Sequence, residues 1–332
     1  MTRRPARLLA LAALVPLHGC YVSSTADDDS GSRPDADADT PGDVAEWEGS
    51  PECPAGMVYV PAGPFIFGCD SEGGDELWRW KCELNGRPPG VPVVLSRPFC
   101  IDRTEVTNSA YAVCVADGAC SVPARFSAVE RDSYWGNPVY ADHPVVNVVW
   151  TSASDYCAWA GKRLPTEAEW MKAARGGCEI SGPSTCGEED ARLFPWGNTL
   201  PECHQAQRVG CGVSAGVTRA VGLLPEGASP YGVLDMADNV SEIVQDYFQD
   251  YGAGGTPWWW EVTCSAGCVD PAGPPADWSD YTAGQRVVVG WTNAMLEPEF
   301  MVLPATVSSA ADGPTGVSWS ASTGFRCAAD VE

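Results

Sequence analysis

Cysteine places the strongest constraint on how this chain can fold. The 332 residues include fifteen cysteines, and the first, Cys20, ends an N-terminal segment with the features of an export signal. In that segment three arginines precede the apolar run at residues 8–15, which is too short to span a bilayer as a helix in the mature protein. Because exported proteins enter oxidising compartments, the fourteen cysteines beyond Cys20 are expected to form disulfides.

Residues 1–20 are interpreted as a lipoprotein signal peptide. Their end, Leu17-His18-Gly19-Cys20, resembles a bacterial lipobox, in which cleavage precedes the cysteine and its thiol carries diacylglycerol. Several acyl chains on Cys20 would anchor the mature protein to a lipid bilayer, on the periplasmic or outer side of the cell envelope. The alternative is an ordinary signal peptide that is cleaved elsewhere.

Residues 21–52 form the second segment, which contains ten acidic residues and one arginine. A segment with so few large apolar residues cannot bury a core, so it is predicted to be a disordered tether. The tether carries a formal charge of −9 and residues 1–20 carry +3, so residues 53–332 carry −18 of the total −24. A domain this acidic is not expected to bind nucleic acid.

Several cysteines in residues 53–332 lie close to a partner in sequence. The pairs expected from this spacing are Cys114 with Cys120, Cys178 with Cys186, Cys203 with Cys211, and Cys264 with Cys268. Zinc is the competing use of cysteine, but the chain has no Cys-x-x-Cys pair and only His143 and His204 beyond the signal. Disulfides that hold local loops are therefore favoured.

Turns are expected to dominate this domain, since the chain has 35 glycines and 28 prolines. Residues 57–69 alternate apolar and polar around Pro61-Ala62-Gly63, which predicts a β-hairpin, and residues 91–107 are strand-like. Thr107 is the expected N-cap of a helix over residues 108–116. The absence of βαβ alternation and of a repeat favours the α+β class.

Two further short helices are expected on either side of Gly161. Ser152 with Asp155, and Thr166 with Glu169, have the spacing of a capping box, in which each partner's side chain satisfies the other's backbone N–H. The block "RLPTEAEW" is interpreted mainly as a core-building helix start, with Trp170 and the following Met171 supplying buried area.

Six sequence blocks, in this order, resemble the formylglycine-generating enzyme family, also called sulfatase-modifying factors. They are "MVYVPAGPFIFG", "FCIDRTEVTNSAYAVC", "HPVVNVVWTSASDYCAWAGKRLPTEAEWMKAARGG", "FPWGN", "SPYGVLDMADNVSE" and "GFRCAAD". The resemblance implies one disulfide-rich α+β domain over residues 53–332, with little regular structure and a C-type-lectin-like topology. It also implies a disulfide between Cys157 and Cys327. Of the remaining cysteines, Cys69 is expected to pair with Cys82 and Cys53 with Cys100.

The resemblance also implies structural calcium. Asn198 in "FPWGN" matches one ligand, and Asn239 and Glu242, with Val240 between them, match a second cation position. Amide, carboxylate and carbonyl oxygens suit calcium. Two departures weaken the match: no acidic residue follows "FPWGN" where one is expected, and Ser241-Glu242-Ile243 replaces the usual Trp-Glu-Trp.

Active family members oxidise a cysteine of unfolded sulfatases to formylglycine, using two cysteine thiolates that bind copper(I) upstream of the "GFRC" cysteine. This chain has no cysteine from residue 269 to residue 326, so neither catalytic residues nor copper are expected. Met295 and Met301 as thioether ligands, or an iron site built on His143 and His204, are the alternatives, and neither pattern favours a metal.

The sequence therefore favours a non-catalytic binding or interaction module over an enzyme. Trp258, Trp259 and Trp260 could form an aromatic platform for a glycan or protein ligand, or could fill the core. The alternative function is a formylglycine-generating oxidase, or a diverged oxidoreductase of the same family, that acts on protein cysteine.

Overall fold

The computed structural model describes residues 52–67, 91–181, 186, 190, 192–199, 201–207, 211–212, 214, 216–247, 268–273, 286–290 and 320–331. All of them belong to one compact unit, Pro41–Glu332. The segments interpreted as signal peptide and tether lie outside the described residues, except for Glu52. None of the helices in the described ranges is long and apolar enough to cross a membrane.

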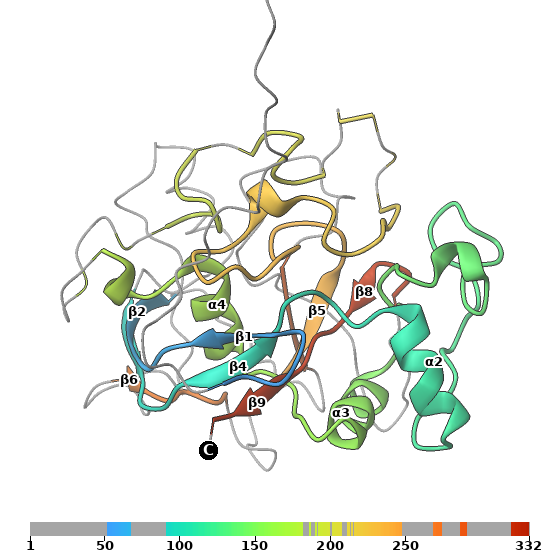
Figure 1. Cartoon of the computed structure of the whole chain (residues 1–332), viewed down its shortest axis with the longest axis horizontal. Helices are drawn as coiled ribbons and strands as arrows, with labels where there is room; N and C mark the ends of the chain where they lie inside the picture. The colour runs from blue at the N-terminus through green and yellow to red at the C-terminus, as the bar shows by residue number, and fades with distance from the viewer. Residues whose placement is uncertain are drawn as a thin grey trace, which may run out of the picture. The chain divides into compact units, whose positions relative to one another are not determined.

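In the described ranges, short strands and three α-helices make up the regular structure (Figure 1). The strands are β1 (Met57–Val60), β2 (Gly63–Phe67), β3 (Val91–Leu95), β4 (Phe99–Asp102), β5 (Ser241–Tyr247), β6 (Cys268–Val269), β7 (Arg286–Val289), β8 (Thr323–Gly324) and β9 (Ala328–Asp330). The α-helices are α2 (Asn108–Ala116), α3 (Trp150–Trp159) and α4 (Glu167–Arg175), and single 3-10 turns occur at Pro138–Tyr140, Cys178–Ile180 and Pro225–Gly227. The sparse α+β architecture expected from the sequence is confirmed.

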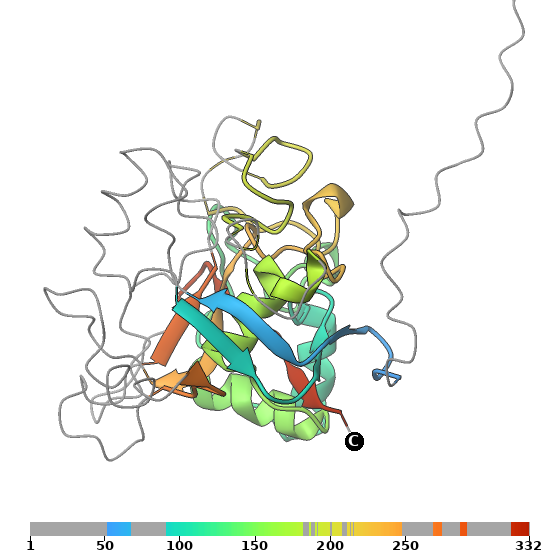
Figure 2. The same ribbon diagram turned by 90° about the vertical axis from the view of Figure 1, so that its left-hand side faces the viewer.

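The strands form three small sheets, with the orders β1-β4-β9, β2-β3-β6 and β7-β5-β8. Most of these pairings join distant segments: Cys100 of β4 lies opposite Ala329 of β9, and Glu242 of β5 opposite Gly324 of β8. In Figure 2 an N-terminal strand in blue lies beside a strand in teal, as the antiparallel pairings of β1 with β4 and of β2 with β3 require.

The hairpin expected at residues 57–69 is wrong. β1 and β2 pair with β4 and β3, so the chain passes from one sheet to another at Pro61–Gly63 and does not turn back on itself. Gly63 has a φ of 133°, a conformation that residues with a Cβ rarely adopt. The alternation identified two half-buried strands correctly, but alternation carries no information about which strand is the partner.

Local signals placed the helices well. Helix α2 has the expected bounds, and the Thr107 hydroxyl accepts a hydrogen bond from the Ala110 N–H at 3.2 Å. Helix α4 has the full capping box between Thr166 and Glu169. The box expected at Ser152 is wrong, because α3 already begins at Trp150 and has no side-chain cap.

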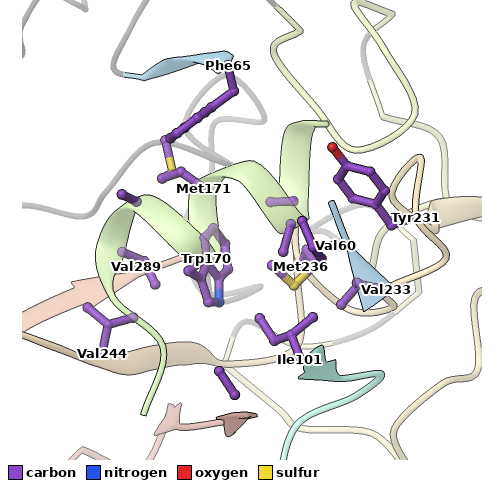
Figure 3. Packing of buried hydrophobic residues seen from close by; sticks show 14 of the residues in the cluster. Val60, Phe65, Ile101, Trp170, Met171, Tyr231, Val233, Met236, Val244 and Val289 are labelled. Carbon is purple, nitrogen blue, oxygen red and sulfur yellow. The ribbon is translucent and has the colours of Figure 1, made fainter. Parts of the chain in front are cut away.

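Helix α4 buries its apolar side against strands of two sheets and forms the centre of the core (Figure 3). Trp170 and Met171 are fully buried, as expected from the "RLPTEAEW" block, and pack among Val60, Ile101 and Val289. Helices α2 and α3 pack against each other in a second cluster around Tyr111, Tyr156 and Phe325. These two clusters hold the short strands in place.

Five disulfides join described cysteines, and each is a pair expected from the sequence. They are Cys53–Cys100, Cys114–Cys120, Cys157–Cys327, Cys178–Cys186 and Cys203–Cys211. Cys268 is also disulfide-bonded, whereas Cys264, Cys69 and Cys82 lie outside the described residues. Cys157–Cys327 spans 170 residues and links α3 to the segment between β8 and β9.

Candidate functional site

A network of buried charges occupies the place where the sequence suggested a cation. Arg326 donates from Nε and Nη2 to the two carboxylate oxygens of Glu242, each at 2.7 Å, and the indole N–H of Trp170 donates to Oε2 at 2.9 Å. Arg326 and Glu242 are almost completely buried. Because a guanidinium and an indole already satisfy the carboxylate, Glu242 does not fit a calcium ion in this arrangement.

The side-chain oxygens of the two asparagines suggested as calcium ligands also accept hydrogen bonds from the protein. Asn239 is buried, and its Oδ1 accepts from the Arg219 N–H at 3.0 Å. Asn198 uses its Oδ1 to accept from the Leu193 N–H at 2.8 Å, within its own turn. The side-chain oxygens of Asn198, Asn239 and Glu242 thus already accept from N–H donors, and Val240 could contribute only its backbone carbonyl, so this arrangement does not favour the calcium implied by the resemblance, which stays a prediction. No set of three or more His, Cys, Asp or Glu in the described ranges is arranged to hold a metal.

Arg219 acts as the internal cation for a pair of buried aspartates. Its guanidinium pairs with Asp235 and with both oxygens of Asp238, at 2.6 and 2.9 Å for the latter. Burial raises the pKa of Asp238 to about 6, although Arg219 acts in the opposite direction. One guanidinium of the chain is thus shared between the two carboxylates and balances the charge of one of them.

Glu105 lies beside this network without a hydrogen bond. Its side chain is 2% exposed, and neither carboxylate oxygen has a partner among the described residues. Burial, followed by repulsion from Asp235, raises the pKa of Glu105 well above its ordinary value. A buried carboxyl of this kind is most easily accommodated in its neutral form.

Residues considered for redox chemistry are not brought together. Every described cysteine is in a disulfide. His143 lies 3.1 Å from a guanidinium nitrogen of Arg131, and burial lowers its pKa to about 4. His204 lies instead between two exposed carboxylates, those of Glu202 and Glu226. Met295, Met301 and residues 258–260 lie outside the described residues.

A pocket of about 290 Å³ lies between the turn from β3 to β4, the start of α4 and the C-terminal strand β9. Among the described residues, its aliphatic lining includes Leu95, Pro98, Leu164, Pro271, Ala272 and Val331, and its polar lining includes Arg97, Arg163, Thr166, Glu169, Gln245, Asp270 and Asp330. A concave site with aliphatic walls and a few polar groups is typical of small-molecule binding.

Two of the polar groups are held rigidly. Arg163 bridges the carboxylates of Glu169 and Asp330, each at 2.6 Å. Burial alone would lower the pKa of Arg163, but its bonds to these two carboxylates raise that pKa above its ordinary value. Asp270 has a left-handed backbone with φ of 47°, and its carboxylate accepts from the N–H of Ser96 at 2.7 Å and from the Ser96 hydroxyl. A non-glycine residue in this conformation is uncommon and occurs often at binding sites.

Other polar groups of the pocket remain available. Within the described part of the chain, neither the exposed guanidinium of Arg97 nor the side-chain amide of Gln245 has a hydrogen-bond or ion-pair partner. The Asp330 side chain is 67% exposed, and Arg163 occupies its Oδ1 alone. The pocket therefore offers a cation, a neutral amide and a carboxylate oxygen to a ligand.

Sequence reasoning did not identify this pocket. Its residues come from five separate segments, and the structure brings these together through pairings such as Val93 with Cys268, which no local pattern predicts. The Asp270-Pro271 dipeptide signals a turn, but it does not indicate what the turn contacts.

The fold and the buried network define a class of protein: a disulfide-linked α+β domain with little regular structure, organised around a buried Arg-Glu pair. Residues 39–331 match the family of the sulfatase-modifying factor enzyme 1-like domain. The chain belongs to this family.

Similar curated proteins include formylglycine-generating enzymes. That of Thermomonospora curvata is 30% identical over 84% of this chain and 95% of its own length, and that of Bos taurus is 28% identical over 89% of this chain and 79% of its own. A mouse protein named inactive C-alpha-formylglycine-generating enzyme 2 is 29% identical over 59% of this chain and 70% of its own. The PvdO structure from Pseudomonas aeruginosa has a TM-score of 0.54 at 23% identity, covering 83% of this chain and 94% of that one, which shows a shared fold.

Proposed function

We propose that this chain is a lipid-anchored envelope protein whose family domain binds a ligand and does not oxidise cysteine. One observation carries the proposal: no cysteine lies between Cys268 and Cys327, the interval in which the family resemblance places the copper-binding pair. The described cysteines are all committed to disulfides, so none of them offers a substitute thiolate. The similarity to a mouse protein named as inactive is a further support.

The catalytic test uses the purified chain, copper(I), oxygen and a peptide containing Cys-x-Pro-x-Arg. We expect no aldehyde by mass spectrometry, whereas the Thermomonospora curvata enzyme, treated identically, provides the positive control. Turnover of the peptide by this chain would refute the proposal and favour the alternative, an oxidase or diverged oxidoreductase of the family. That alternative draws on the similarity to the formylglycine-generating enzymes.

Anchoring through Cys20 is the second part of the proposal. Expression of the full chain in a bacterium fed an alkyne fatty acid should label the wild-type protein and place it in the membrane fraction. The substitution Cys20→Ser should abolish labelling, because the thiol is the acylation site. Label that persists in the substituted protein would exclude this anchor.

A further inference from the structure

We propose that the pocket between the β3–β4 turn, α4 and β9 binds a small zwitterion with an aliphatic body, of the size of an amino acid or a dipeptide. This inference deepens the proposed binding function and rests on it. The pocket's volume of about 290 Å³ lies near the lower end of the range for ligand pockets.

The available polar groups form a positive end and a negative end of the pocket, which are called its two poles. Arg97 supplies a guanidinium that has no partner among the described residues, and a guanidinium suits a carboxylate through charge-assisted hydrogen bonds. Asp330 supplies a carboxylate oxygen that Arg163 leaves unoccupied, which suits an ammonium group. Gln245 adds an amide that can donate to one ligand atom and accept from another.

The rest of the lining restricts the body of the ligand. The apolar walls formed by the described residues are leucine, proline, alanine and valine side chains, and no aromatic ring is among the described lining residues. A sugar or a nucleobase would therefore find no stacking surface among these described residues, whereas an aliphatic side chain would bury apolar area against Leu95, Pro98 and Leu164.

The charge of the whole domain restricts the net charge of the ligand. Residues 53–332 carry a formal charge of −18, which disfavours a ligand with net negative charge. Asp270 and the Arg163–Glu169–Asp330 group are held by internal bonds, so the Asp330 pole is preorganised, whereas the exposed Arg97 side chain must be ordered when a ligand binds. A zwitterion fits this pocket because it has no net charge and carries one charged group for each pole.

Isothermal titration calorimetry of the full chain tests the proposal with four probes: L-leucine, Leu-Leu, L-leucinamide and N-acetyl-L-leucine. We expect binding of L-leucine or Leu-Leu, and at least tenfold weaker binding of the two blocked forms, since each lacks one charge. Arg97→Ala should weaken binding of the unblocked probe about tenfold, and Asp330→Asn should weaken it by a similar factor. Arg103→Ala, which removes another exposed arginine, is the matched control and should bind as wild type does.

Two results would overturn the proposal: no heat of binding with any of the four probes, or an Arg97→Ala protein that binds L-leucine or Leu-Leu as tightly as wild type does. Failure here is distinguishable from failure of the proposed function. Aldehyde formation in the copper assay refutes the non-catalytic proposal whatever the titration shows, whereas absence of both aldehyde and zwitterion binding refutes only the pocket assignment.

Discussion

The pair formed by Arg326 and Glu242 shows how one residue of the "GFRC" block is used. Arg326 donates to the backbone carbonyls of Asp102, Arg103 and Leu234 as well as to Glu242, so a single guanidinium connects the end of β4, the loop before β5 and β5 itself. Without Arg326, the carbonyls of Asp102 and Leu234 and the Oε1 of Glu242 would lose their donor among the described residues, whereas the Arg103 carbonyl keeps the Leu234 N–H and Glu242 Oε2 keeps the Trp170 indole.

Removing one member of this pair should therefore be costly. Glu242→Ala leaves a buried guanidinium without its counter-charge, and we expect a loss of about 3–5 kcal/mol in the free energy of unfolding, measured by urea denaturation. Glu202→Ala, at an exposed carboxylate, should change it by less than about 0.5 kcal/mol. Equal effects of the two substitutions would contradict the role given to the pair.

The titration of Asp246 gives a second test at this scale. Asp246 is buried and accepts from the Glu167 N–H at 2.7 Å, and burial raises its pKa from 3.8 to about 7, with Glu169 acting in the same direction and Arg286 against it. Because the folded-state pKa is the higher one, the stabilisation is complete below about pH 4 and is lost as pH rises through about 7.

The contribution of Asp246 to the unfolding free energy, measured from pH 4 to pH 8 as the difference between the wild type and Asp246→Asn, should therefore decline with pH. Asp246→Asn keeps an oxygen for the Glu167 N–H and cannot ionise, so its decline should be shallower than that of the wild type. A slope identical to that of the wild type would mean that Asp246 is already ionised throughout this range.

At the scale of single elements, helices α3 and α4 differ in their N-terminal caps, although the sequence predicted a capping box for both. Thr166→Ala removes the cap of α4, and we expect a loss of about 1 kcal/mol in the free energy of unfolding. Thr151→Ala, in the first turn of uncapped α3, is the control and should be close to neutral. Urea denaturation measures both; a neutral Thr166→Ala would show that the capping box contributes nothing.

Prediction from sequence succeeded where the determining contacts are local. Thr107 and Thr166 bond to backbone groups three residues ahead, so the sequence alone locates the starts of α2 and α4. It failed for β1 and β2, whose partners lie some forty and thirty residues away, respectively. The pocket could not be predicted from the sequence for the same reason. Long-range strand pairings bring together its polar residues Arg97, Gln245, Asp270 and Asp330.

For the whole molecule, the disulfides differ in what they restrain. Cys157–Cys327 spans 170 residues, whereas Cys114–Cys120 spans 6. In the chain-entropy treatment the longer closure restricts the unfolded chain more. All four cysteines are buried in the same cluster, so the two bridges make a matched comparison.

Replacing both cysteines of the long bridge by alanine should lower the free energy of unfolding by about 2–5 kcal/mol, and replacing both of the short bridge should lower it by less. Urea denaturation of the two double variants measures the difference. A larger loss for Cys114→Ala/Cys120→Ala would contradict the entropic account.

The pairing of β4 with β9 has a consequence for the nascent chain. The Cys327 N–H bonds the Asp102 carboxylate 225 positions away, and β8, next to β9, completes the sheet built on β5. At a synthesis rate of about 5–20 residues per second, the edge of β4 stays open for roughly 10–45 s before its partner exists. During that interval an open strand edge can pair with another chain, and the formal charge of −18 on residues 53–332 opposes such pairing through repulsion between copies.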